Sequence, residues 1–139
     1  MSDKVHARVV MQEGLHFVGT ADSGHTIHLD SPLSDETHGP TPMEVALMSL
    51  AGCSAMDVIS ILRKKRHQVH AFEIEVEGTR AERYPKPYTL ITLHYILRGP
   101  AIDNQSVERA IELSRENYCP IWNMLAHSVE IRYTYQISE

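Results

Sequence analysis

Cysteine is scarce in this chain of 139 residues, which contains Cys53 and Cys119 and no third thiol. Two cysteines are too few for the disulfide framework that stabilises small secreted domains. They also lack the paired spacing of a structural zinc site, so we expect no metal and no cofactor. In a reducing compartment, a pair of thiols is instead available for transient redox chemistry.

An excess of positive charge is also lacking: the chain has 13 lysines and arginines and 18 acidic residues, and its net charge is -5. A nucleic-acid-binding surface needs clustered basic residues, so we expect no nucleic-acid partner. The one dense basic cluster, residues 63–66, lies at the predicted end of a helix, where cations stabilise the helix dipole. The segment MSDKVHARVV at the start of the chain contains no apolar signal segment. We therefore predict a cytoplasmic protein.

One long apolar run is present, TPMEVALMSLAGCSAMDVISILRKKR, residues 41–66. Thr41 and Glu44 form a capping-box pattern and Pro42 suits the first helical position, which predicts a helix. Apolar residues cover nearly its whole circumference, as in a membrane span or a central core helix. Glu44 and Asp57 within the run favour the core helix, so we expect no membrane partner. Enclosing such a helix in so small a chain takes a second copy, which predicts a homodimer.

The remaining segments predict an α+β fold in the order βββ-α-ββ-α-β, with mostly antiparallel strands and a single domain over residues 1–139. Pro120 disfavours helical geometry at Cys119, so an amphipathic helix ends there and a short further helix opens. Alternating apolar residues predict strands, and a helical period predicts the amphipathic helix. The strands are expected over residues 4–11, 15–20, 25–30, 71–80, 88–97 and 128–137, and the helix over 103–118.

The two cysteines have different predicted surroundings. Cys119 lies at the predicted N-terminus of a helix, where the dipole stabilises a thiolate. Cys53 lies in the middle of the apolar helix, and Asp57, one turn further on, shares its face and opposes ionisation. From the residues alone two interpretations of Cys53 stay open. The favoured one is an inert core residue, and the other is a thiol activated by a group from elsewhere in the fold.

Histidine is plentiful, with nine residues scattered along the chain. His25 and His28 point to opposite faces of their predicted strand, so they cannot share a metal ion simply. The spacing therefore predicts no histidine metal site.

Two segments, TPMEVALMSLAGCSAMDV and NYCPIWN, together with the element order, resemble the OsmC/Ohr family of osmotically inducible and organic hydroperoxide resistance proteins. The resemblance covers nearly the whole chain. It implies an intertwined homodimer with buried central helices. It also implies a thiol peroxidase in which Cys53 attacks an organic hydroperoxide and becomes a sulfenic acid. Cys119 would resolve that acid as a disulfide, and an external dithiol would reduce the disulfide.

The chain departs from the peroxidase pattern at two places. Those members carry glutamate directly after the proline that leads the central helix, where this chain has Met43. They also carry an arginine in the N-terminal strand region, whereas residues 11–24 contain none and His16 is the nearest substitute. The group that activates Cys53 therefore stays open. The alternatives are a non-enzymatic dimer of this fold that binds an apolar ligand or a partner protein, and a redox sensor.

Overall fold

A computed structural model describes residues 3–139. The chain divides into two compact units, residues 1–46 and 47–139, and each is described by itself. The order of strands and helices matches the predicted α+β layout. The prediction of a single domain over residues 1–139 stays a prediction.

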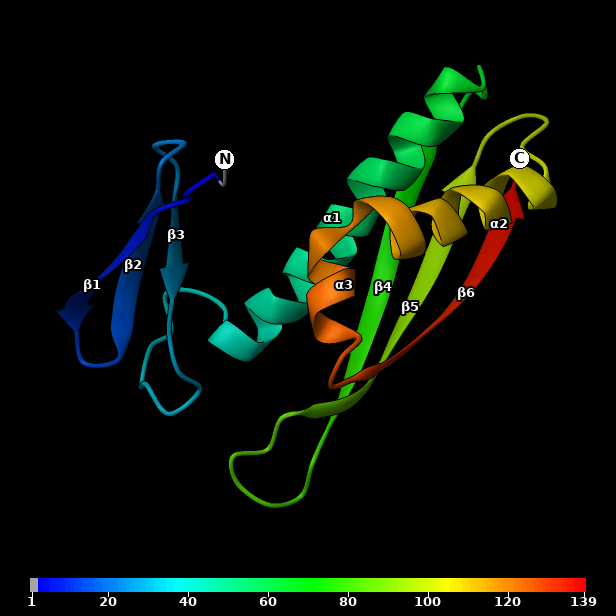
Figure 1. The fold of residues 1–139 in the computed structure, drawn as a ribbon. Coiled ribbons are helices and arrows are strands. Elements are labelled where there is room, and N and C mark those ends of the chain that lie inside the picture. Colours follow the sequence, from blue (N-terminus) through cyan, green and yellow to red (C-terminus); the bar gives the residue numbers. More distant parts are fainter. Residues whose placement is uncertain (1–2) are drawn as a thin grey trace. The chain divides into compact units, whose positions relative to one another are not determined.

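The first unit contains an antiparallel meander of β1 (Ala7–Glu13), β2 (His16–Ala21) and β3 (Thr26–Leu29), in that order (Figure 1). Both hairpin turns use glycine in the left-handed region, with φ 57° at Gly14 and φ 85° at Gly24. That region costs a residue with a Cβ free energy, which explains the glycine at each turn. The three strands predicted for this part of the chain are present, with bounds shifted by one to three residues.

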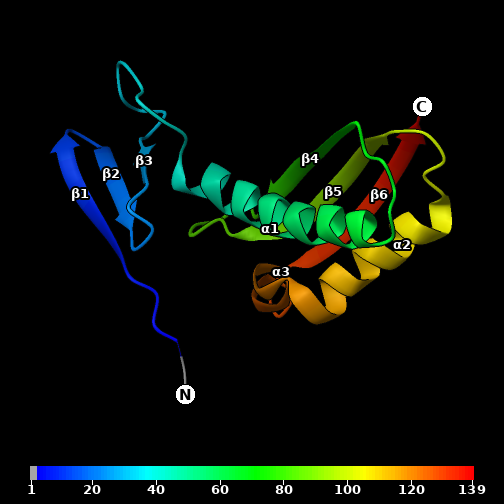
Figure 2. The ribbon, with the colours of Figure 1, turned by 90° about the horizontal axis from the view of Figure 1, so that it is seen from above.

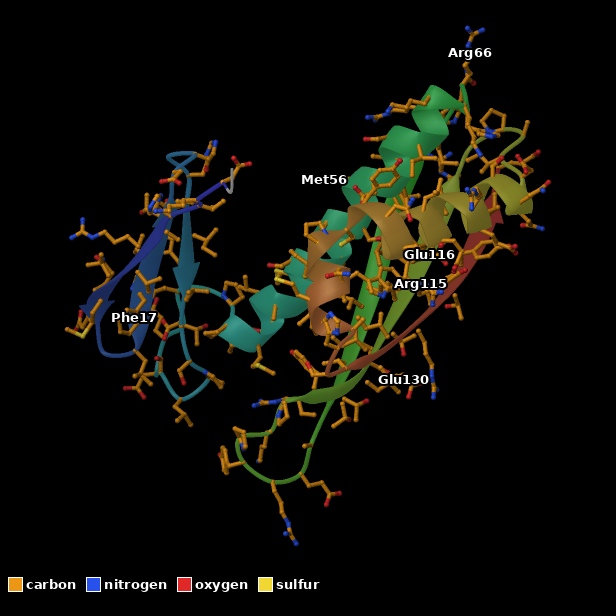
Figure 3. The ribbon with its side chains drawn as sticks, viewed as in Figure 1. Phe17, Met56, Arg66, Arg115, Glu116 and Glu130 are labelled. Atoms are coloured by element: carbon orange, nitrogen blue, oxygen red, sulfur yellow. The ribbon has the colours of Figure 1, made fainter. Side chains whose placement is uncertain are left out.

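The long helix α1 (Pro42–Lys64) begins with the predicted capping box. The Thr41 N–H donates to Glu44 Oε1 at 2.9 Å, and the Glu44 N–H donates to Thr41 Oγ1 at 3.2 Å. At its other end the His67 N–H donates to the Leu62 carbonyl, and Arg66 adopts φ 64° (Figure 3). This is the hydrogen-bond pattern of a Schellman motif, in which glycine usually takes the left-handed position.

The second unit is built on a sheet in the order β4-β5-β6. Strands β4 (Ala71–Arg80) and β5 (Tyr88–Arg98) pair antiparallel, and β6 (Glu130–Ser138) pairs parallel to β5. The connection from β5 to β6 contains α2 (Asn104–Leu113), a π-helical turn η1 (Ser114–Tyr118) and α3 (Pro120–Leu125). The helices lie on one face of this sheet (Figures 1 and 2).

The core of the second unit lies between α1, α2 and the sheet. Helix α1 contributes Leu50, Val58 and Leu62, all fully buried and spaced at multiples of four so that they share one side. Its opposite side carries Met48, 55% exposed, and Met56, 72% exposed (Figure 3). Among the described helices, α1 alone has the length and apolar composition to cross a membrane. The side with Leu50, Val58 and Leu62 is buried as in a core helix, whereas the side with Met48 and Met56 is exposed in the single chain.

Candidate functional site

The fold brings Cys53 and Cys119 together. Cys53 lies on α1, one turn before Asp57, and Cys119 is the N-cap residue of α3. The two sulfur atoms and a carboxylate oxygen of Asp57 all lie within 4.8 Å of one another. Cys119 is 2% exposed and Cys53 is partly buried. The two residues singled out in the sequence therefore share one site, and Asp57 shares it with them.

Local backbone geometry positions Cys119. The π-helical turn η1 closes with a 2.8 Å hydrogen bond from the Cys119 N–H to the Ser114 carbonyl. Pro120 then requires an extended conformation at Cys119, which adopts φ -83° and ψ 103°. The Trp122 N–H, in the first turn of α3, donates to Cys119 Sγ at 3.3 Å. The sulfur is thus held at a fixed place at the predicted helix N-terminus.

The predicted stabilisation of a Cys119 thiolate is wrong. Burial, followed by the hydrogen bond with Cys53, raises the pKa of Cys119 to about 12. The N–H groups of Trp122 and Ile121 lower the pKa, but they do not offset the loss of water around the sulfur. Cys119 is therefore a thiol at neutral pH, able to donate its S–H toward Cys53.

A buried chain of hydroxyl groups reaches Asp57. Ser114 Oγ lies 2.9 Å from Asp57 Oδ2 and 2.9 Å from Ser54 Oγ, and Ser54 Oγ lies 2.6 Å from the Tyr95 hydroxyl. An ionised carboxylate only accepts and a serine has one hydrogen to donate. Ser114 therefore donates to Asp57, Ser54 to Ser114, and Tyr95 to Ser54. Burial raises the pKa of Tyr95, so its hydroxyl keeps the hydrogen that starts the chain. The network holds the Asp57 carboxylate in place.

A pocket of about 400 Å³ adjoins the site, and Asp57 forms part of its wall. Ile61 and Leu113 give it apolar surface, and Lys64 and Lys65 add positive charge. Asp57 therefore belongs to the pocket as well as to the thiol site.

The donor atoms of Cys53, Asp57 and Cys119 form the one group within residues 3–139 compact enough to consider for a metal ion. A structural zinc ion takes four ligands and needs its cysteines as thiolates. Three donors are present here, one fewer than a structural zinc ion takes. The group therefore lacks one ligand of a structural zinc site.

The first unit contains a cluster of histidines that spacing did not predict. His16 Nε2 lies 2.7 Å from His28 Nδ1, and the rings of His16 and His38 stack with centroids 4.4 Å apart. These residues lie on β2, on β3 and in the loop that follows it. The pairing of β2 with β3 brings His16 to His28, and the His38 N–H donates to Asp30, the residue after β3. His16, the residue nearest to the place of the family arginine, belongs to this cluster.

Comparisons with known proteins give consistent results. The family model described as OsmC-like protein matches residues 34–134. Protein YhfA of Escherichia coli K12 is 41% identical over 133 residues, which cover 96% of this chain and 98% of that protein. A crystal structure of a hypothetical protein from Aquifex aeolicus matches with a TM-score of 0.89 and 28% identity, over 99% of both chains. The organic hydroperoxide resistance protein OhrB of Bacillus subtilis matches with a TM-score of 0.66 and 13% identity, over 96% of this chain and 98% of that one. The chain therefore belongs to the family of OsmC-like proteins.

Proposed function

We propose that this protein is a thiol peroxidase that reduces organic hydroperoxides, with Cys53 as the peroxidatic cysteine and Cys119 as the resolving cysteine. The observation that carries the proposal is the approach of the two sulfur atoms to within 4.8 Å. A disulfide needs a sulfur separation of about 2.05 Å, so the proposed cycle requires the two sulfur atoms to move closer together. A resemblance in fold to an organic hydroperoxide resistance protein supports the same chemistry.

In the proposed reaction the Cys53 thiolate attacks the outer oxygen of the hydroperoxide. The O–O bond breaks, the alcohol leaves, and Cys53 becomes a sulfenic acid. The Cys119 sulfur then attacks Cys53 Sγ, water leaves, and a disulfide forms. An external dithiol reduces that disulfide and returns both thiols, as the reducing cytoplasm would allow.

An organic substrate suits the surroundings better than hydrogen peroxide. The pocket beside Asp57 has apolar walls from Ile61 and Leu113. Apolar surface of this kind favours a hydroperoxide that carries a hydrocarbon group, because contact between the two removes apolar area from water. Cumene hydroperoxide is a suitable test substrate.

The functional form is proposed to be a homodimer. Met48 and Met56 leave one side of α1 apolar and exposed in the single chain. Exposed apolar surface in a contiguous patch commonly marks an interface, and two copies of one helix can cover each other about a twofold axis.

The test is to add excess cumene hydroperoxide to the reduced protein and to count free thiols with time. We expect both thiols to be lost together as the alcohol appears. Cys53→Ala should abolish the reaction, and Cys119→Ser should stop at a Cys53 sulfenic acid that dimedone traps. Persistence of both thiols in the unaltered protein would refute the peroxidase and leave the non-enzymatic dimer. Thiol loss without catalytic turnover in the presence of dithiol would instead indicate the redox sensor.

A further inference from the structure

The proposed peroxidase lacks an assigned group for moving protons. Each of its two steps expels a basic oxygen, first an alkoxide and then a hydroxide. Each step also begins from a thiol, and the Cys119 thiol holds its hydrogen firmly because of burial. An acid–base group near both sulfur atoms would take the proton from each thiol and give it to each leaving oxygen.

Asp57 occupies that position. Its carboxylate oxygen is within 4.8 Å of Cys53 Sγ and of Cys119 Sγ, and the same residue forms part of the wall of the adjoining pocket. Within residues 3–139 no lysine or arginine forms an ion pair with Asp57. The hydrogen bond from Ser114 fixes one of its oxygens. The carboxylate is therefore oriented but not neutralised by a basic partner.

We propose that Asp57 is a catalytic acid–base group that takes the proton of each attacking thiol and gives it to the oxygen that leaves. This inference rests on the peroxidase function proposed above. It gives Cys53 a neighbouring functional group in a chain whose residues 11–24 contain no arginine.

In the peroxide step, Asp57 takes the proton of the Cys53 thiol and leaves a thiolate. The thiolate forms a bond to the outer peroxide oxygen, which keeps its own hydrogen, and the O–O bond breaks. The electron pair of that bond goes to the inner oxygen as an alkoxide, which accepts the proton from Asp57 and departs as the alcohol. Cys53 is oxidised by two electrons to the sulfenic acid, the hydroperoxide is reduced, and Asp57 is a carboxylate again.

In the resolving step, Asp57 takes the proton of the Cys119 thiol. The Cys119 sulfur then forms the S–S bond to Cys53, and the S–O bond of the sulfenic acid breaks. The hydroxide that leaves receives the proton from Asp57 and departs as water. A single carboxylate serves both steps because it lies near both sulfur atoms.

A carboxylate beside a thiol also has an opposite electrostatic effect, which makes the inference testable. Its negative charge disfavours a neighbouring thiolate. Removing the charge without changing the shape should therefore make Cys53 no less reactive toward a reagent that needs only a thiolate. The same change should slow a reaction that also needs a proton delivered to the leaving oxygen.

The experiment compares Asp57→Asn with the unaltered sequence, both in a Cys119→Ser background at pH 7. Monobromobimane alkylation measures thiolate reactivity, and dimedone-trapped sulfenic acid after cumene hydroperoxide measures the peroxide step. General acid–base groups contribute about 100-fold or more, so we expect Asp57→Asn to slow the peroxide step by about 100-fold. Alkylation should be as fast as before or faster. In the protein with both cysteines, Asp57→Asn should also slow disulfide formation after one equivalent of hydroperoxide.

Glu75→Gln is the matched control, because Glu75 is an exposed carboxylate on β4 outside the site. It should leave both rates unchanged. Asp57→Ala provides a second variant, in which sodium formate, against sodium chloride at the same ionic strength, should restore part of the peroxide rate through the adjoining pocket. Circular dichroism verifies that each variant is folded.

Two results would overturn the inference. Asp57→Asn could reduce hydroperoxide as fast as the unaltered sequence, or both of its rates could rise together, which would leave Asp57 with a charge effect alone. A protein that reacts with monobromobimane at Cys53 but not with cumene hydroperoxide would instead refute the peroxidase function, and the proton transfer with it.

Discussion

The hydrogen bond from Ser114 to Asp57 should be a large contributor to the stability of the second unit. Ser114 is fully buried and lies 2.9 Å from both Asp57 Oδ2 and Ser54 Oγ. A hydrogen bond to a charged group contributes about 1.5–3 kcal/mol, and a neutral one contributes about 1 kcal/mol. Ser114→Ala removes both hydrogen bonds and deletes only the hydroxyl oxygen of the side chain. Asp57 is only partly buried, so water replaces part of the lost bond. We therefore expect a loss of about 2–3 kcal/mol from a total of about 5–15 kcal/mol.

The measurement is urea unfolding followed by circular dichroism, at one protein concentration because self-association adds to apparent stability. Tyr95→Phe provides a graded comparison, since it removes the 2.6 Å contact with Ser54 and leaves Ser54 its other partner. It should cost about 1 kcal/mol. Ser60→Ala, on the exposed side of α1, should stay within about 0.5 kcal/mol of the unaltered protein.

A double-mutant cycle of Ser114→Ala with Asp57→Ala then isolates the pair. The coupling free energy should reach about 1 kcal/mol, because the two side chains interact directly. Equal losses of unfolding free energy for Ser114→Ala and Ser60→Ala would refute the charge-assisted hydrogen bond. A larger loss for Tyr95→Phe than for Ser114→Ala would refute it as well.

Three further predictions concern other parts of the molecule. Arg66→Gly should raise the free energy of unfolding by about 1 kcal/mol, because glycine adopts φ 64° without the cost of a Cβ, and thermal unfolding measures it. Hydrogen bonds, foremost from the Ser34 hydroxyl, hold the pKa of Asp30 well below its usual range. Its stabilisation is therefore present above the unfolded carboxyl pKa of about 4 and is lost as the pH falls. Asp30→Asn should lower the urea midpoint at pH 7 and flatten its decline between about pH 4 and pH 2, whereas an unchanged slope would contradict this. Met56→Lys, at a position 72% exposed on α1, should shift light-scattering mass from dimer to monomer, whereas Glu75→Lys on β4 should not.

The sequence predicted best those features that local chemistry determines. The capping box at Thr41 and Glu44 is visible in four consecutive residues, and the structure contains both of its hydrogen bonds. The order of strands and helices followed from alternation and helical period in the same way. The end of the amphipathic segment at Cys119 and the short helix after Pro120 are also confirmed, because proline constrains its own backbone and that of its neighbour.

Features that depend on tertiary packing could not be predicted in this way. The meeting of Asp57, Ser114 and Tyr95 joins α1, the π-helical turn and β5, and no spacing in the sequence relates them. The pKa of Cys119 was mispredicted because the helix dipole is a local effect, whereas the loss of water around the sulfur depends on the whole fold. The apolar circumference of α1 likewise did not indicate which side a single chain would bury.

The position of Trp122 makes the protein its own optical probe. The chain contains one tryptophan, so all of its tryptophan emission reports on this residue. Trp122 is 2% exposed, its backbone N–H donates to Cys119 Sγ, and its indole packs edge-on against Tyr133 with ring centroids 6.5 Å apart. Any change in the bonding of that sulfur therefore occurs beside the fluorophore. Each half of a redox cycle should leave its own trace in stopped-flow emission, without a label and without altering either thiol.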